Sequence, residues 1–203
     1  MDPNPPFTVL EGKLHDLDAN LLRCDCMVSP ANSFGIMDGG YDDILSIAFK
    51  DQRNDYWTLT NHVQEYLKRE AHGYLAPGSC LMVPLPSDLA GDNNPWKARF
   101  IAVIPTMRTP SNVAWHRDLV YNSMWTLQVA IENWNRDHPE GEPIRRVLMT
   151  GLATGCGFVP PKKCAVQMVL SVQQFLEPIP EQPRWVDVMQ RDARVEATTK
   201  LTT

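Results

Sequence analysis

Short apolar runs alternate with longer amphipathic stretches along most of this chain. The apolar runs are bounded by proline, glycine or polar residues and occupy positions 7–10, 25–28, 80–85, 100–104 and 146–150. Between them, apolar residues recur at spacings of three and four over 41–48, 56–69, 120–134 and 161–176. The compact runs predict strands, and the spaced residues predict helices that pack on them. Strands that alternate with helices are typical of an α/β layered domain.

Two loops are the least ordinary parts of the sequence. One reads S-P-A-N-S-F-G-I-M-D-G-G over 29–40, and the other reads G-L-A-T-G-C-G-F-V-P over 151–160. Each follows a predicted strand and precedes a predicted helix. In open α/β sheets, ligands bind in such loops at the carboxyl ends of the strands. We therefore expect a ligand site formed by these two loops.

Length and hydropathy indicate a single folded unit. The chain has 203 residues, the size of one domain with short extensions. We expect a flexible amino terminus over 1–6, one domain over 7–187, and a flexible polar tail over 188–203. No apolar run approaches the ~20 residues that span a bilayer, so we expect no membrane contact. Five cysteines without a signal-like start favour a cytoplasmic protein, with a nuclear one not excluded.

Charge and metal-ligand spacing narrow the classes of ligand. The formal net charge of −5 argues against nucleic-acid binding through diffuse positive charge. It leaves room for an anionic small molecule, because backbone amides bind phosphate without cationic side chains. The histidines and cysteines show no metal-binding spacing, so we expect neither a metal nor another cofactor. The cysteines are interpreted as structural thiols.

The loop over 151–160 has the chemistry of a phosphate site. Its glycines allow a ligand to approach the backbone, and Pro161 begins a helix whose first amides are unpaired. A purely structural turn explains the same residues about equally well. Cys156 would be a nucleophile only if its pKa were lowered, and a loop-filling role is favoured because no histidine is adjacent.

The loop over 29–40 offers polar groups beside adjacent glycines. Asn32 has an amide that can bond a sugar hydroxyl, and Gly39 and Gly40 allow backbone amides to face a ligand. Asp42 follows at the start of a helix. Its carboxylate fits either a general base or an acid favoured there by the helix dipole, and the second interpretation is the stronger one for this residue alone.

Together, these segments resemble the ligand loops of macrodomains. The stretch V-S-P-A-N-S followed by D-G-G-Y-D over 28–42 is similar to their N-A-A-N segment, glycine run and Val-Asp pair. The stretch over 150–161 is similar to their phosphate loop, P-x-L-G-T-G-x-G-x-x-P. The segment I-P-T-M-R-T-P over 104–110 resembles a subgroup whose first loop has the form S-P-A-N-S-F-G. The resemblance extends over about 7–176.

The resemblance implies a fold, a ligand and a set of site residues. The implied fold is a three-layer α/β/α sandwich with a mixed central sheet, and the implied ligand is ADP-ribose or an ADP-ribosylated protein. Asn32 would contact and fix the distal ribose for catalysis, and Asp42 falls where hydrolytic members keep a catalytic aspartate. The other implied ligand-binding residues are Leu14, Gly39, Gly40, Tyr41, Thr154, Gly155, Cys156, Gly157 and Phe158.

Three departures from the family pattern keep two alternative functions open beside hydrolysis. The early turn reads Gly12-Lys13-Leu14 and lacks the usual adenine-reading aspartate, Ser29 replaces the first asparagine, and Asp38 interrupts the glycine run. We expect binding of ADP-ribose with hydrolysis of mono-ADP-ribose linkages or related derivatives. The alternatives are a non-catalytic reader of ADP-ribose and a pocket for another nucleotide.

Overall fold

The computed structural model describes residues 7–178 and 180–201. The expected flexible segment over 1–6 lies outside the described residues. The elements in chain order are β1 (Cys26–Ser29), α1 (Gly40–Ala48), α2 (Thr58–Ala71), β2 (Leu81–Pro84), the 3-10 turn η1 (Gly91–Asn93), β3 (Phe100–Val103), α3 (Leu119–Asp137), β4 (Val147–Leu148), α4 (Pro161–Phe175) and α5 (Trp185–Thr199). No helix in this part of the chain is long and apolar enough to cross a membrane.

The central sheet is mixed, as the resemblance to macrodomains implies. Its strand order is β2-β3-β1-β4. Strand β1 pairs in parallel with β3 and β4, and β2 pairs antiparallel with β3. The carboxyl ends of β1, β3 and β4 therefore share one edge of the sheet, and their amino ends share the opposite edge.

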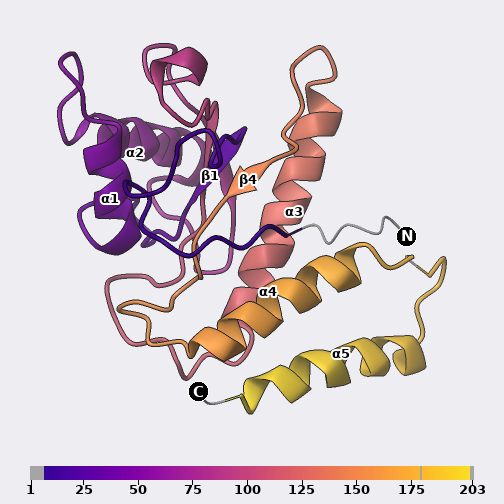
Figure 1. Ribbon diagram of the computed structural model, residues 1–203. Helices are drawn as coiled ribbons and strands as arrows, with labels where there is room; N and C mark the ends of the chain where they lie inside the picture. The colour runs from indigo at the N-terminus through magenta and orange to yellow at the C-terminus, as the bar shows by residue number, and fades with distance from the viewer. Residues whose placement is uncertain (1–6, 179, 202–203) are drawn as a thin grey trace.

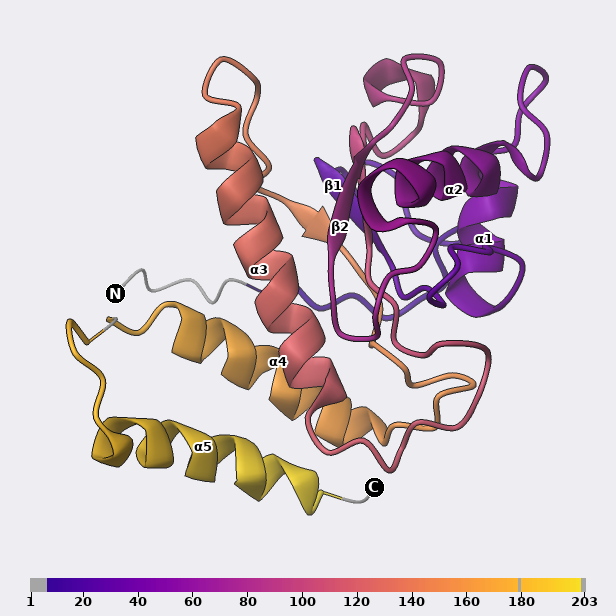
Figure 2. The same ribbon diagram turned by 180° about the vertical axis from the view of Figure 1, so that it is seen from behind.

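Successive side chains of the buried strands point to opposite faces of the sheet and belong to two separate cores. Met27 and Ile101 belong to the core beneath α1 and α2, whereas Val28 and Ala102 belong to the core with α3 and α4. Figures 1 and 2 show these two helix pairs on opposite sides of the sheet. The expected three-layer α/β/α sandwich is confirmed.

The predicted strand over 7–10 is wrong. This segment has no regular secondary structure, and the side chain of Val9 is 90% exposed. A short run of β-branched residues forms a strand only where it pairs and buries one face. Here the segment instead lies along an apolar cavity that Met168 and Val169 of α4 also line.

The structure has helix α5 where the sequence analysis expects a flexible tail. The side chain of Asp187 accepts a hydrogen bond from the backbone amide of Arg184 at 3.0 Å and so caps the helix. Figure 2 shows α5 lying alongside α4 on the outside of the sandwich. Polar side chains make much of the contact, since Gln174 donates to the carbonyl of Arg191 at 3.2 Å. The apolar side chains Trp185, Val186 and Met189 of α5 are exposed, so the hydropathy pattern does not mark the face that docks.

Gln167→Ala is expected to loosen this outer layer. Gln167 is fully buried; its amide donates to the Arg117 carbonyl at 2.8 Å and to Thr198 Oγ1 at 2.9 Å. Truncation removes both hydrogen bonds and leaves the part-buried Arg117 carbonyl without this donor, at a cost of about 1–3 kcal/mol in unfolding free energy. Urea unfolding followed by circular dichroism measures the change. Gln173→Ala, at an exposed position of the same helix, is the control. Equal midpoints for the two variants would contradict the packing described here.

Candidate functional site

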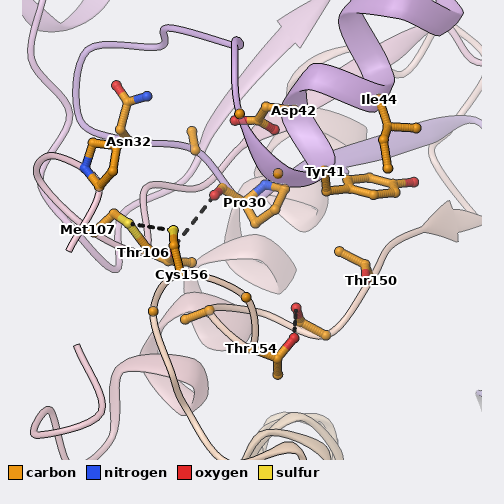
Figure 3. A pocket seen from close by; sticks show the side chains of 18 of the residues that line it. Pro30, Asn32, Tyr41, Asp42, Ile44, Thr106, Met107, Thr150, Thr154 and Cys156 are labelled. Carbon is orange, nitrogen blue, oxygen red and sulfur yellow. Dashed lines mark hydrogen bonds between the residues drawn. The ribbon is translucent and has the colours of Figure 1, made fainter. Parts of the chain in front are cut away.

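Loops that follow β1, β3 and β4 enclose a pocket of about 490 Å³, called here the carboxyl-end pocket. Figure 3 shows Asn32 and Met107 on one side of it and Tyr41 and Ile44 on the other. The lining residues are Pro30, Ala31, Asn32, Ile36, Asp38, Gly39, Gly40, Tyr41, Asp42, Ile44, Thr106, Met107, Pro110, Thr150, Gly151, Ala153, Thr154, Gly155, Cys156 and Gly157.

The loop after β4 presents a row of unpaired backbone amides. Within the described chain, none of the four consecutive N–H groups from Thr154 to Gly157 donates a hydrogen bond. The loop is closed behind them, because the amide of Val159 donates to the Ala153 carbonyl at 3.0 Å. Consecutive free amides of this kind form a concave site for an anion.

Close packing holds this loop in shape. Ala153 has a φ of 58°, in the left-handed region that costs a residue with a side chain some energy. A Cβ on Gly157 would lie 2.5 Å from the Ala153 carbonyl oxygen, so only glycine fits there. A Cβ on Gly155, by contrast, would meet no atom within 4 Å. The loop is therefore rigid at its base and open toward the pocket.

Helix α1 faces the same pocket with its amino-terminal end. Gly39 precedes the helix as its N-cap, and Gly40, its first residue, has a φ of 61° that favours glycine. The first helical amides have no intrahelical partner, and no side chain of the described residues caps them. The positive end of the helix dipole therefore adds to the anion-binding character of the pocket.

Asp42 lies in the first turn of α1 and is only 4% exposed. Its Oδ1 accepts a hydrogen bond of 2.7 Å from the hydroxyl of Ser29, the last residue of β1. Burial raises the pKa of Asp42 to about 7, and the hydrogen bond from Ser29 opposes part of that rise. A buried carboxyl that titrates near neutral pH can accept a proton from a bound molecule.

Asn32 braces its own loop. Its side-chain amide donates to the Ile36 carbonyl at 2.7 Å, and its oxygen accepts from the Phe34 amide at 3.0 Å. Its backbone forms an isolated parallel bridge with Met107. Asn32 thus lines the pocket and braces the loop after β1, while the amide of Ser33 donates to the Met107 carbonyl at 3.1 Å and holds this loop against the loop after β3.

Nine of the eleven residues that the sequence analysis selects line the carboxyl-end pocket: Asn32, Gly39, Gly40, Tyr41, Asp42, Thr154, Gly155, Cys156 and Gly157. Phe158 does not line it and is 66% exposed. Leu14 is buried in a neighbouring cavity of about 420 Å³. Asp38, one of the departures from the family pattern, lines the pocket and is exposed.

The neighbouring cavity, called here the apolar side cavity, adjoins the pocket at Tyr41, Thr150 and Gly151, which line both. Its other walls come from the segment over 7–17 and from β4 and α4. This cavity is not predicted from the sequence. The early turn at Gly12 was the only local signal, because the walls come from segments far apart in the chain.

The loop after β3 also contributes residues that were not selected as site residues. Thr106, Met107 and Pro110 line the pocket, and the thiol of Cys156 lies 3.6 Å from the sulfur of Met107. Figure 3 shows this sulfur pair at the tip of the loop after β4. Across residues 7–178 and 180–201, no group of three or more His, Cys, Asp or Glu side chains is arranged to hold a metal ion.

Comparisons with known proteins identify the fold. No protein-family model matches the chain, and no curated protein matches it significantly. Among solved structures, the macrodomain of Mycobacterium tuberculosis DarG matches with a TM-score of 0.56 and 19% identity, over 83% of this chain and 90% of that one. The Oceanobacillus iheyensis macrodomain with ADP matches with a TM-score of 0.54 and 16% identity, over 87% and 86%. A variant of that protein with ADPR matches with a TM-score of 0.53 and 14% identity, over 87% and 88%. The chain therefore has a macrodomain-like fold.

Proposed function

We propose that this protein binds ADP-ribose, free or attached to a protein. The observation that carries the proposal is the row of four unpaired amides over 154–157, which lies across the carboxyl-end pocket from the start of α1. Such a pair of elements suits a diphosphate, because each supplies backbone donors and partial positive charge. The loop form S-P-A-N-S-F-G supports assignment to the macrodomain subgroup with that loop.

The apolar side cavity is the proposed site for the adenosine half. It adjoins the pocket through Tyr41, so a ligand whose diphosphate contacts the loop over 154–157 extends into it. Its walls are mainly aliphatic and include no acidic side chain. Apolar contact and shape would therefore bind the adenine base. They would replace the adenine-reading aspartate of the macrodomain pattern, which is absent from the early turn of this chain at Lys13.

Calorimetric titration tests the binding proposal. ADP-ribose is expected to bind with one site per chain, and adenosine monophosphate and ribose 5-phosphate are expected to bind more weakly, since each fills only part of the two cavities. Tighter binding of guanosine diphosphate than of ADP-ribose would select the pocket for another nucleotide. Absence of heat with every one of these ligands would refute the proposal.

We further propose that Asp42 supports hydrolysis of a mono-ADP-ribose linkage. A water molecule attacks the anomeric carbon of the distal ribose and gives one proton to the Asp42 carboxylate. The bond from that carbon to the acceptor oxygen breaks, and its electron pair leaves with the oxygen, as a carboxylate where the acceptor is an acidic side chain. A base with a pKa of about 7 is matched to this task at neutral pH. The ligand's own phosphate assists by orienting the water.

A reader without catalysis is the second candidate. It is favoured by Asn32, whose amide is already engaged with Ile36, and by the deep burial of Asp42. A hydrolysis assay on mono-ADP-ribosylated protein, run beside the titration, separates the two functions. Tight binding without release of ADP-ribose selects the reader.

Ser29→Ala is expected to raise the pKa of Asp42 further. The Ser29 hydroxyl stabilises the ionised carboxylate, and its loss leaves that charge without a donor. We expect the midpoint of the Asp42 titration to move up by about one pH unit. NMR of the Asp42 carboxyl carbon across the pH range measures this midpoint whether the protein is a reader or a hydrolase. In a hydrolase, the pH at which the rate reaches half its maximum rises by the same amount.

Ser33→Ala is the matched control for this measurement. Ser33 is equally buried in the same loop, but its hydroxyl has no hydrogen-bond partner within the described residues. Removal of the Ser33 hydroxyl is expected to leave the pKa of Asp42 unchanged. An equal shift in both variants would show that the Ser29 hydroxyl has no specific effect on Asp42.

A further inference from the structure

A second polar cavity lies at the opposite edge of the sheet, at the amino ends of the parallel strands. It has a volume of about 570 Å³ and is called here the amino-end cavity. Its walls come from segments just before β1, β3 and β4 and from η1. The lining residues are Arg23, Cys24, Asp25, Gly91, Asp92, Lys97, Arg99, Glu142, Arg145 and Arg146.

Positive charge is in excess in this cavity. Five of its side chains are cationic and three are carboxylates, although the whole chain carries a net charge of −5. Arg99 is neutralised by ion pairs with Asp25 and Glu142, and Lys97 pairs with Asp92. Within the part of the chain that the structure describes, Arg23, Arg145 and Arg146 form no ion pair with a carboxylate. Three guanidinium groups therefore remain available to a ligand.

Asp25 fixes the backbone that carries these arginines. Its Oδ2 accepts hydrogen bonds from the amides of Arg145 and Arg146 at 2.8 and 2.9 Å, and its Oδ1 accepts one from Arg99 at 3.2 Å. Burial raises the pKa of Asp25, but the bonds from the two backbone amides and the bond and charge of Arg99 together outweigh it and hold the pKa below its usual value. The carboxylate is thus permanently charged near neutral pH and ties the start of β4 to β1.

The arginines also converge from separate parts of the chain. Arg146 donates to the carbonyl of Arg23 at 3.4 Å, which brings the segments before β4 and β1 together. Guanidinium groups bind phosphate oxygens through paired hydrogen bonds, and several of them on a fixed frame suit linked phosphates. The limited volume and the acidic remainder of the molecule disfavour a long polyanion.

We propose that the amino-end cavity is a second ligand site, which binds a compact oligophosphate of two or three linked phosphate groups. Arg23, Arg145 and Arg146 supply the binding charge, and Asp25 and Arg99 hold the wall. The site is independent of the carboxyl-end pocket, because the two lie at opposite edges of the sheet.

Titration with inorganic pyrophosphate, followed by proton–nitrogen NMR, tests the proposal. The Nε–H signals of the three arginines report this cavity alone, so binding of pyrophosphate to the carboxyl-end pocket does not interfere. We expect saturable shifts of these signals and weaker binding of orthophosphate. Arg145→Gln is expected to weaken the affinity about tenfold. The control is Arg69→Gln, at an exposed position of α2 that does not line the cavity.

Two results would overturn the proposal. One is a response of the arginine signals to chloride, at matched ionic strength, as large as the response to pyrophosphate. The other is an affinity for pyrophosphate that is the same in Arg145→Gln as in Arg69→Gln. ADP-ribose binding is followed separately through the backbone amide signals of residues 154–157. A failure of that binding is therefore distinguishable from a failure of pyrophosphate binding in the amino-end cavity.

Discussion

Gly155→Val will abolish ADP-ribose binding while the fold stays intact. A Cβ at Gly155 meets no atom within 4 Å, and the residue has no positive φ, so the protein itself tolerates a side chain there. The same position lies within the row of free amides that lines the carboxyl-end pocket. The valine side chain then occupies the space required by the diphosphate. We expect affinity to fall by at least about 100-fold, with an unchanged melting temperature.

Two further variants separate steric exclusion from damage to the fold. Gly141→Val makes the same chemical change in a loop outside the pocket, where a Cβ meets the His138 carbonyl oxygen only at 3.4 Å, and it is expected to bind normally. Gly157→Val drives a Cβ into the Ala153 carbonyl oxygen and is expected to lower the melting temperature. Retained affinity in Gly155→Val would mean that the ligand does not use this loop.

The layered fold was predictable because the central strands are buried on both faces. Residues 100–103 are apolar without a break, since Ile101 faces one helical layer and Ala102 the other. Proline and glycine mark the ends of such runs in the sequence. The local hydropathy pattern does not predict the structure where strand pairing or helix docking decides it, as at 7–10 and in α5. Among residues 7–178 and 180–201 the first segment has no strand partner, and α5 docks partly through Gln167 and Gln174.

The candidate site was predictable to the level of loops. Glycines and prolines over 29–40 and 151–160 mark turns, and strand order brings both loops to one edge. The polar contacts inside the site depend on tertiary geometry instead. The bond from Ser29 to Asp42 joins the end of a strand to a helix, and the bridge from Asn32 to Met107 joins two loops. No spacing in the sequence encodes either contact.

Asp42→Asn is expected to lose hydrolysis and keep ADP-ribose binding. An amide of the same shape preserves the pocket but accepts no proton from water, so turnover should fall by about 10²–10⁴-fold. The affinity for ADP-ribose should change little, because the backbone amides over 154–157 are untouched. Unchanged turnover in this variant would exclude Asp42 as the catalytic group.

The same variant is expected to be more stable than the parent protein above pH 7. Asp42 keeps its proton up to about pH 7 in the folded state, whereas an exposed aspartate loses it near 3.8. Below pH 3.8 both states are protonated, and burial then costs no charge. As pH rises from 3.8 to 7, the unfolded chain ionises first, so the stability of the parent protein falls and stays low above pH 7. Asparagine carries no charge to desolvate.

The gain should therefore be small at pH 4 and reach about 2–4 kcal/mol at pH 8, as measured by urea unfolding across that range. Asp38→Asn is the control, because that side chain is exposed and folding does not remove it from water. Suppose that Asp42→Asn is more stable at pH 8 and has also lost turnover. The buried carboxylate then lowers the stability of the protein and is retained for its chemistry. A pH-independent difference would mean that burial does not control the charge of Asp42.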